Sequence, residues 1–226
     1  MTYGFEYINN EDVVTVDSEF SRMVVVSKGR YAPTQESGLG STTYFSSVVT
    51  SQEPPLVFVK PDKVNAVAGL CRALILGSPG NWTGFYVRAY SSTSAQPNGY
   101  YFAAGFQVTP SAQYGAQLYD ASEKLVFDTG SPVAVFTKAL QTWTYITAGT
   151  DAQGLPMAYF SVPFDFSSND YMLINNFSMD MAGSQTRDVS LYCWWDFPSN
   201  RLWAITIGAA VQNSLYLPVV FSKMQA

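Results

Sequence analysis

Histidine is absent from this sequence of 226 residues, and charged side chains make up only 13% of it. The missing histidine removes the commonest metal ligand and the commonest general base at neutral pH. The formal net charge is −5, and the 12 lysines and arginines are scattered, so the basic patch typical of nucleic-acid-binding proteins is missing. We therefore expect no nucleic-acid partner, no metal or other cofactor, and no histidine-dependent catalysis.

Cysteines and long apolar runs are equally scarce. Cys71 and Cys193 are the only cysteines, and each stands in an apolar stretch, which favours buried free thiols over a disulfide. The longest apolar run, residues 64–76, contains Asn65 and Arg72 and is too short to span a membrane. The N-terminus has neither the basic nor the apolar region of a signal peptide. We expect synthesis in a cytoplasm and no membrane insertion.

The residues that are abundant favour an all-β fold. Aromatic residues reach 15% of the chain, and short apolar or alternating segments are separated by clusters of Gly, Pro, Asn and Ser. Residues 64–77 fit a short helix or a strand, and we favour the strand, while residues 27–41 are predicted to be a loop. The other predicted strands cover residues 22–26, 43–49, 56–60, 85–90, 100–108, 133–136, 143–146, 158–162, 171–174, 190–195, 202–207 and 216–221.

One pattern occurs twice. Residues 3–17, YGFEYINNEDVVTVD, align without a gap with residues 114–128, YGAQLYDASEKLVFD, at an offset of 114 − 3 = 111 positions. Because this offset is close to half the chain, we predict an internal duplication that gives two tandem β-sandwich domains, residues 1–110 and 111–226. The alternative is a chance likeness of two hairpins. The identical positions are Tyr3 and Tyr114, Gly4 and Gly115, Asp17 and Asp128, and Val24 and Val135.

Each copy of the pattern is expected to form a β-hairpin. Apolar residues alternate on both sides of a polar segment, residues 9–12 in the first copy and 120–124 in the second. Asn and Asp in these segments suit turns because their side chains bond the nearby backbone. The shared tyrosines, glycines and aspartates therefore need only a structural role.

Candidate catalytic groups are few. Asp165 and Asp170, in the segment FDFSSND, could form a carboxylate pair of the glycosidase kind, but the segment also reads as a turn. A serine nucleophile elbow, a calcium loop and a glycine-rich phosphate loop are all missing from the sequence. We therefore predict that the protein is not an enzyme.

Aromatic residues form the densest group with a possible binding role. Trp194 and Trp195 are adjacent, so in a regular strand they point to opposite faces, and one of them must lie outside its own core. Exposed aromatic side chains anchor interfaces and stack on sugar rings. The alternative is that most of them fill a core. The candidate interface or sugar-binding residues are Trp194, Trp195, Trp203, Trp82 and Tyr86.

The repeated motif, Tyr3-Gly4 to Ser18 and Tyr114-Gly115 to Thr129, resembles short β-domains encoded in the tail gene clusters of tailed bacteriophages. Neither copy keeps the turn glycine that is common there, near Glu11. The resemblance covers about 23 residues in each half of the chain and implies a structural virion protein of the tail tip, baseplate or tail-fibre base.

The same resemblance implies the partners. These would be other tail proteins and further copies of the chain, with a trimer expected by analogy with phage fibres, and a host-surface glycan or protein. Two other functions stay open: a carbohydrate-binding receptor-recognition protein that uses Trp194, Trp195 and Trp203, and a capsid decoration protein. The low charge content favours an assembly role, because a surface with few charges suits burial against other subunits.

Overall fold

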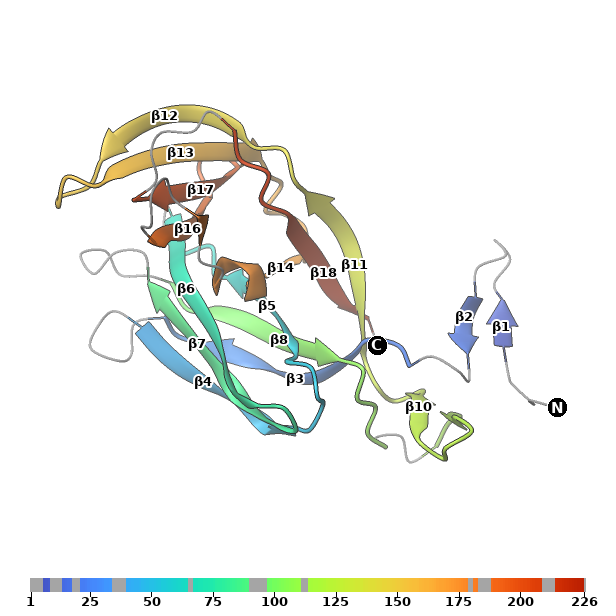
Figure 1. The fold of residues 1–226 in the computed structure, drawn as a ribbon. Coiled ribbons are helices and arrows are strands. Elements are labelled where there is room, and N and C mark those ends of the chain that lie inside the picture. The colour runs from blue at the N-terminus through green and yellow to red at the C-terminus, as the bar shows by residue number, and fades with distance from the viewer. Residues whose placement is uncertain are drawn as a thin grey trace.

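A computed structural model describes residues 6–8, 14–17, 21–33, 40–64, 67–89, 97–110, 114–178, 181–182, 188–208 and 214–225 (Figure 1). Within this part of the chain the regular elements are β-strands and one 3₁₀ turn, η1 (Asn175–Ser178), so the predicted all-β class is confirmed. No helix among the described residues is long and apolar enough to cross a membrane.

The described residues form eighteen strands, numbered here in the order of the chain. The first half contains β1 (Glu6–Ile8), β2 (Val14–Asp17), β3 (Val24–Tyr31), β4 (Gly40–Val49), β5 (Leu56–Pro61), β6 (Val67–Ser78), β7 (Asn81–Ala89) and β8 (Gly99–Gly105). The second half contains β9 (Gln117–Tyr119), β10 (Leu125–Asp128), β11 (Val133–Leu140), β12 (Thr144–Thr150), β13 (Pro156–Pro163), β14 (Tyr171–Leu173), β15 (Met181–Ala182), β16 (Asp188–Asp196), β17 (Arg201–Ile207) and β18 (Val219–Gln225).

Most strands lie where the sequence predicts them, with one clear error. Residues 27–31 belong to β3 rather than to a loop, because Ser27–Tyr31 pair with Ala103–Gly99 of β8. Residues 40–41, at the other end of the predicted loop, belong to β4. The glycine and polar residues that suggested a loop are tolerated there by the backbone hydrogen bonds of the sheet. The ambiguous segment 64–77 forms β6, as favoured, although residues 65–66 lie outside the described part.

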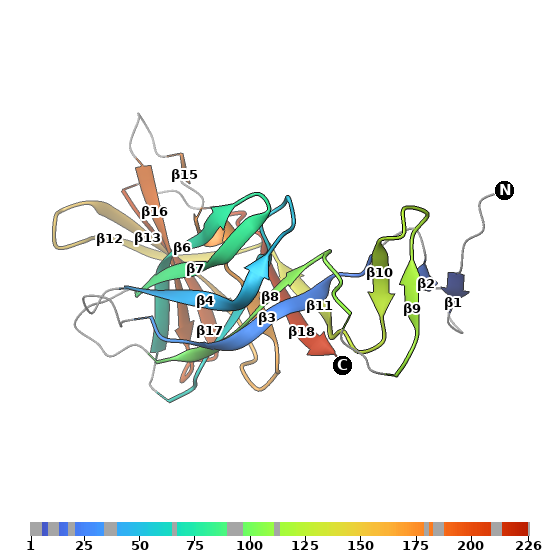
Figure 2. The same cartoon turned by 90° about the horizontal axis from the view of Figure 1, so that it is seen from below.

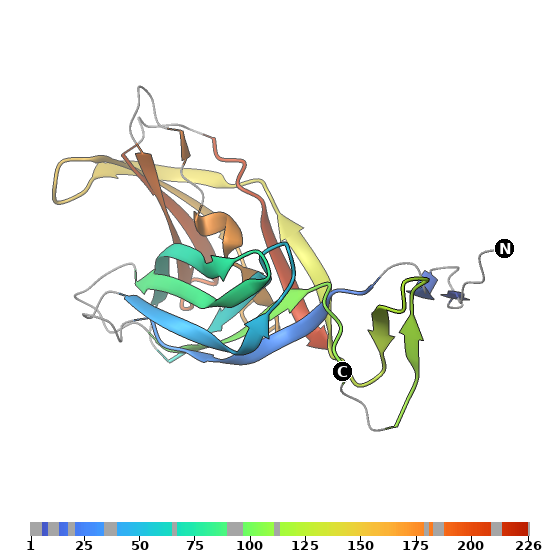
Figure 3. The same ribbon diagram turned by 60° about the horizontal axis from the view of Figure 1, so that its bottom comes forward.

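Two sheets build the body of the molecule. The strand order β11-β18-β14-β5-β8-β3 closes into a barrel, and the order β12-β13-β17-β16-β6-β7-β4 forms an open sheet, with β15 paired to β16. Figure 3 shows the open sheet curving beside the barrel strands.

The two sheets show the same internal order in both halves of the chain. In the barrel, β3, β8 and β5 are followed by β14, β18 and β11, so the order of the second half mirrors that of the first. In the open sheet, β4, β7 and β6 are followed by β16, β17 and β13, with β12 added at the end. The strand order is thus mirrored about the centre of each sheet.

Both sheets continue across the predicted boundary between residues 110 and 111. Val24 pairs with Val133, Val59 with Met172, and Leu70 with Cys193, which joins β3 to β11, β5 to β14, and β6 to β16. Each half alone would leave the hydrogen-bonding groups of these strands unpaired. The two halves of the chain therefore share both sheets.

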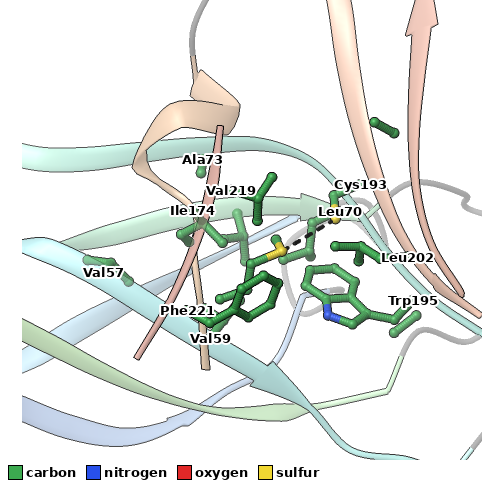
Figure 4. Packing of buried hydrophobic residues seen from close by; sticks show 14 of the residues in the cluster. Val57, Val59, Leu70, Ala73, Ile174, Cys193, Trp195, Leu202, Val219 and Phe221 are labelled. Atoms are coloured by element: carbon green, nitrogen blue, oxygen red, sulfur yellow. Dashed lines mark hydrogen bonds between the residues drawn. The ribbon is translucent and has the colours of Figure 1, made fainter. Parts of the chain in front are cut away.

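Apolar side chains fill two clusters. The main core takes buried residues from both sheets, among them Val57 and Val59 of β5 and Trp195 of β16 (Figure 4). The smaller cluster draws only on barrel strands, and at its centre Phe58 stacks on Phe102 with ring centroids 4.8 Å apart. Alternation along β5 explains the separation, since neighbouring residues in a strand face opposite sides.

Two hairpins, β1–β2 and β9–β10, form small sheets of their own outside the body (Figure 2). Glu6 pairs with Asp17 in the first hairpin, and Gln117 pairs with Asp128 in the second, which is the predicted offset of 111. Both registers then shift at the same place, since Ile8 pairs with Val14 and Tyr119 with Leu125. The repeated sequence pattern therefore corresponds to a repeated backbone structure.

The second hairpin explains its motif residues. Gly115 has φ 150°, a conformation that favours glycine, and Tyr114 is 93% exposed. The Asp128 carboxylate is buried and accepts hydrogen bonds from the Gln117 side-chain amide at 2.8 Å and from the Gly130 backbone N–H at 2.7 Å. Tyr3 and Gly4 lie outside the described residues, as do the side chains of β1 and β2.

Candidate functional site

Trp194 and Trp195 face opposite sides of β16, as the sequence predicts. Trp195 is 3% exposed and belongs to the main core, where it packs with Leu202 and Phe221 (Figure 4). Trp194 is half-buried on the other face of the open sheet, directly opposite Trp203 of β17. Burial against the core therefore accounts for Trp195, whereas Trp194 and Trp203 need another explanation.

The outer face of the open sheet carries an aromatic layer around this tryptophan pair. Ile205 is fully buried but belongs to neither core cluster, and its cross-strand partners are Tyr159 and Tyr192, both half-buried. Cross-strand partners lie on the same face of a sheet. We call Tyr159, Tyr192, Trp194 and Trp203 the outer aromatic layer. These four side chains are half-buried on the face of the open sheet that points away from the main core.

Trp82 and Tyr86 have structural surroundings. The Trp82 indole N–H donates a hydrogen bond to the Ser51 carbonyl oxygen at 2.9 Å, and its ring packs against the main core. Tyr86 covers Gly40, where a side chain would collide with the tyrosine hydroxyl. The five aromatic residues singled out in the sequence are therefore not assembled into one site.

A cleft of about 400 Å³ opens between the end of β5 and the loop that joins β13 to β14. Its apolar floor contains Phe164, Phe166, Trp195, Phe197 and Phe221. The ring centroids of Phe164 and Phe221 are 4.6 Å apart, those of Phe164 and Phe166 4.9 Å, and those of Phe166 and Phe197 5.1 Å. We call this pocket the phenylalanine cleft. The sequence pattern does not predict this cleft, because its lining residues come from five separate segments of the chain.

Charged and polar side chains contact one another around the cleft. Lys138 Nζ lies 3.4 Å from an Asp170 carboxylate oxygen and 4.1 Å from the centroid of the Phe164 ring. Lys60 Nζ donates to the Asn169 side-chain oxygen at 2.8 Å. Lys60, Asn169 and Asp170 line the cleft, so these contacts fix the positions of side chains at its mouth.

A second ion pair lies at the side of the cleft formed by β5 and β8. Arg30 donates to both carboxylate oxygens of Asp62, one at 2.8 Å, and its guanidinium lies 4.1 Å from the centre of the Tyr100 ring. The hydrogen bond to Asp62 raises the pKa of the Arg30 guanidinium. Asp62 and Tyr100 line the cleft, so this pair orients both of them.

The two aspartates considered as a catalytic pair have separate tasks. Asp165 accepts hydrogen bonds from the Ser167 N–H at 2.8 Å and the Ser167 hydroxyl at 2.9 Å, which holds the pKa of its carboxyl below the ordinary value. It therefore closes a turn, in agreement with the turn interpretation. Asp170 lines the cleft, where it pairs with Lys138. The described residues contain no cluster of three potential metal ligands.

No protein-family model, curated protein sequence or solved structure matches this chain.

Proposed function

We propose that the protein is a non-catalytic structural virion protein of a tailed phage, which assembles in the tail tip or baseplate or at the base of tail fibres. The observation that carries this proposal is the character of β4 and β12, the two end strands of the open sheet. Each is paired within the sheet on one side only, so its outer edge suits pairing with further protein chains, although the Ser46 N–H of β4 already donates to the Ser27 hydroxyl.

Both end strands lack the features that normally prevent such pairing. Residues 40–50 and 139–150 contain no charged residue and no proline. Tyr44 is 72% exposed, Val48 47% and Ile146 43%. Free-standing sheets usually protect their edges with charged residues, especially lysine, or with proline. Exposed, uncharged edges with apolar side chains therefore favour an assembled state.

The internal repeat indicates how such an edge would be covered. In the order of the open sheet, β4 occupies the place that β13 occupies in the second half, and β13 is covered by β12. The described residues provide no corresponding strand for β4. A strand from a neighbouring subunit would complete the sheet there. When each subunit uses one edge to bind a different edge of the next subunit, the pairing is head-to-tail, and its repetition produces rings or filaments.

The assignment to a phage tail rests on the resemblance of the two hairpins. Their shared register and shared bulge support the view that this motif is one structural unit used twice. The proposal that the protein is not an enzyme is supported by the separate, ion-paired or turn-forming roles of Asp165 and Asp170.

Sedimentation of the purified protein tests the assembly proposal. We expect oligomers, a trimer first, and expect Tyr44→Lys with Val48→Lys to shift them towards monomer, because two lysines on β4 oppose edge pairing. Tyr114→Lys, on the β9–β10 side, is the matched control. A wild-type protein that stays monomeric at high concentration and that no tail component retains in a pull-down would contradict the proposal.

Carbohydrate recognition remains the second candidate function, and the phenylalanine cleft is the observation that favours it. Trp195 reaches this cleft, whereas Trp194 and Trp203 lie on the other face of the sheet. Capsid decoration would use the same edge strands. Adjacency of the gene to tail-fibre genes or to the major capsid gene separates that role from a role in the tail.

A further inference from the structure

We propose that the phenylalanine cleft binds an acidic saccharide. This inference does not depend on the assembly role; it rests on the second candidate function, carbohydrate recognition, and specifies the class of ligand. The cleft combines a rigid aromatic floor, a polar mouth and an unbalanced positive charge, and each of these three features points to the ligand class.

The floor suits the apolar face of a sugar ring. Phe164, Phe221 and Trp195 are all at least 93% buried and are locked against one another, so they form a preorganised base. Phe166 is half-buried and Tyr100 is 49% exposed, which leaves aromatic surface at the mouth. Pyranose rings present C–H groups on their faces, and these pack against aromatic rings, which carry a negative potential on theirs.

The mouth suits sugar hydroxyls. A carboxylate has about four acceptor positions, and the single lysine contact of Asp170 leaves acceptor capacity on that group. The Asn169 side-chain oxygen is occupied by Lys60, which fixes the amide so that its N–H groups can donate. Donors and acceptors held in place around an apolar floor are typical of small-ligand sites, and the volume of about 400 Å³ lies in their usual range.

The charge balance favours an acidic sugar over a neutral one. Asp62 is neutralised by Arg30, and Asp170 by Lys138. Lys60 and Lys63 also line the cleft, and neither forms an ion pair among the described residues. Besides the hydrogen bonds from Ser167, however, the charges of Lys138 and Lys63 both help to lower the pKa of the nearby Asp165 carboxyl. With Asp165 included, four cationic side chains and three carboxylates lie at the cleft, so one positive charge is left over in a protein whose net charge is −5. A carboxylate on the ligand would supply the missing partner.

Calorimetric titration with two matched ligands tests the proposal: a galacturonic acid trisaccharide and the corresponding galactose trisaccharide, which differ in the carboxylate. We expect the acidic sugar to bind at least 10-fold more tightly than the neutral one. Phe166→Ala should weaken binding of the acidic sugar at least 10-fold, through loss of stacking. Lys63→Gln should weaken binding of the acidic sugar and leave the neutral sugar unaffected.

Tyr119→Ala, an exposed change on β9, is the control and should bind as the wild type does. If Phe166→Ala fails to fold, Asn169→Ala replaces it, since Asn169 is exposed and its loss removes a donor to the sugar. Absence of binding at millimolar sugar, equal affinity for the two sugars, or unchanged binding by Lys63→Gln would each overturn the proposal. Sedimentation reports separately on assembly, so the two proposals fail independently.

Discussion

Val24 lies directly opposite Val133, at the point where the first residue of β3 meets the first residue of β11. The flanking hydrogen bonds are reciprocal: the Val25 N–H donates to the Pro132 carbonyl at 2.8 Å, and the Ala134 N–H donates to the Met23 carbonyl at 2.9 Å. The two halves of the chain thus meet here as two copies of a subunit meet across a two-fold axis. The pairs β5–β14 and β6–β16 continue the same arrangement.

Separating the halves should test this relationship. We expect residues 1–110 and 111–226, expressed alone, to aggregate or to pair with themselves, because each exposes the edges of three strands that the intact chain joins. Co-expressed halves should purify together as a heterodimer, detectable by size-exclusion chromatography. Two stable monomers that do not associate would instead favour independent domains.

The adjacent tryptophans should respond differently to truncation. Trp195→Ala should lower the free energy of unfolding by about 3–5 kcal/mol, because it empties a large volume in the main core. Trp194→Ala should leave the fold intact and, if the outer aromatic layer is an interface, weaken assembly by about 2 kcal/mol or more. Urea unfolding and sedimentation of both variants provide the measurements. If Trp194→Ala destabilised the fold and Trp195→Ala did not, the core would lie on the other face of β16.

Asp128 should be the residue on which the second hairpin depends most. Asp128→Ala leaves the Gln117 amide and the Gly130 N–H without their acceptor, so the hairpin should lose about 1–3 kcal/mol of local stability. Hydrogen exchange at Gly130 and Thr129 should accelerate accordingly. Glu123→Ala, in the exposed turn of the same hairpin, is the control. Equal exchange rates in the two variants would rule out this role for Asp128.

Cys71 should react with alkylating reagents only at high pH. Cys71 lies on β6 beside Leu70, the partner of Cys193, but the two thiols face opposite sides of the sheet, so a disulfide is not expected. Burial raises the pKa of the Cys71 thiol to about 11 from 9.0. The folded state therefore favours the neutral thiol, and this contribution to stability, complete below pH 9, is lost as the pH rises towards 11.

Iodoacetamide labelling followed by mass spectrometry measures this reactivity. Labelling of Cys71 in the native protein should be slow at pH 8 and should accelerate towards pH 11, while urea-unfolded protein labels readily at pH 8. Cys193 should stay unlabelled in the native protein because it is fully buried, with its sulfur directed at Met172. Rapid native labelling of Cys71 at pH 8 would contradict the burial.

The local structure could be read from the sequence because it depends on neighbouring residues. The alternation of apolar and polar residues predicted most strands, and clusters of turn residues predicted where those strands end. The repeated pattern gave the two hairpins with their offset of 111, which the backbone registers reproduce. The opposite orientation of Trp194 and Trp195 followed from the two-residue period of a strand alone.

Long-range pairing decided the rest. The sequence alone determined an all-β chain with a repeated hairpin, because these properties depend on composition and short spacings. It could not determine that β5 pairs with β14 and β6 with β16, because hydrogen bonds between backbones carry almost no sequence signal. The same is true of the phenylalanine cleft: Lys60, Phe164, Trp195 and Phe221 are separated by many residues in the chain, and only the folding of two sheets against each other brings them to one place.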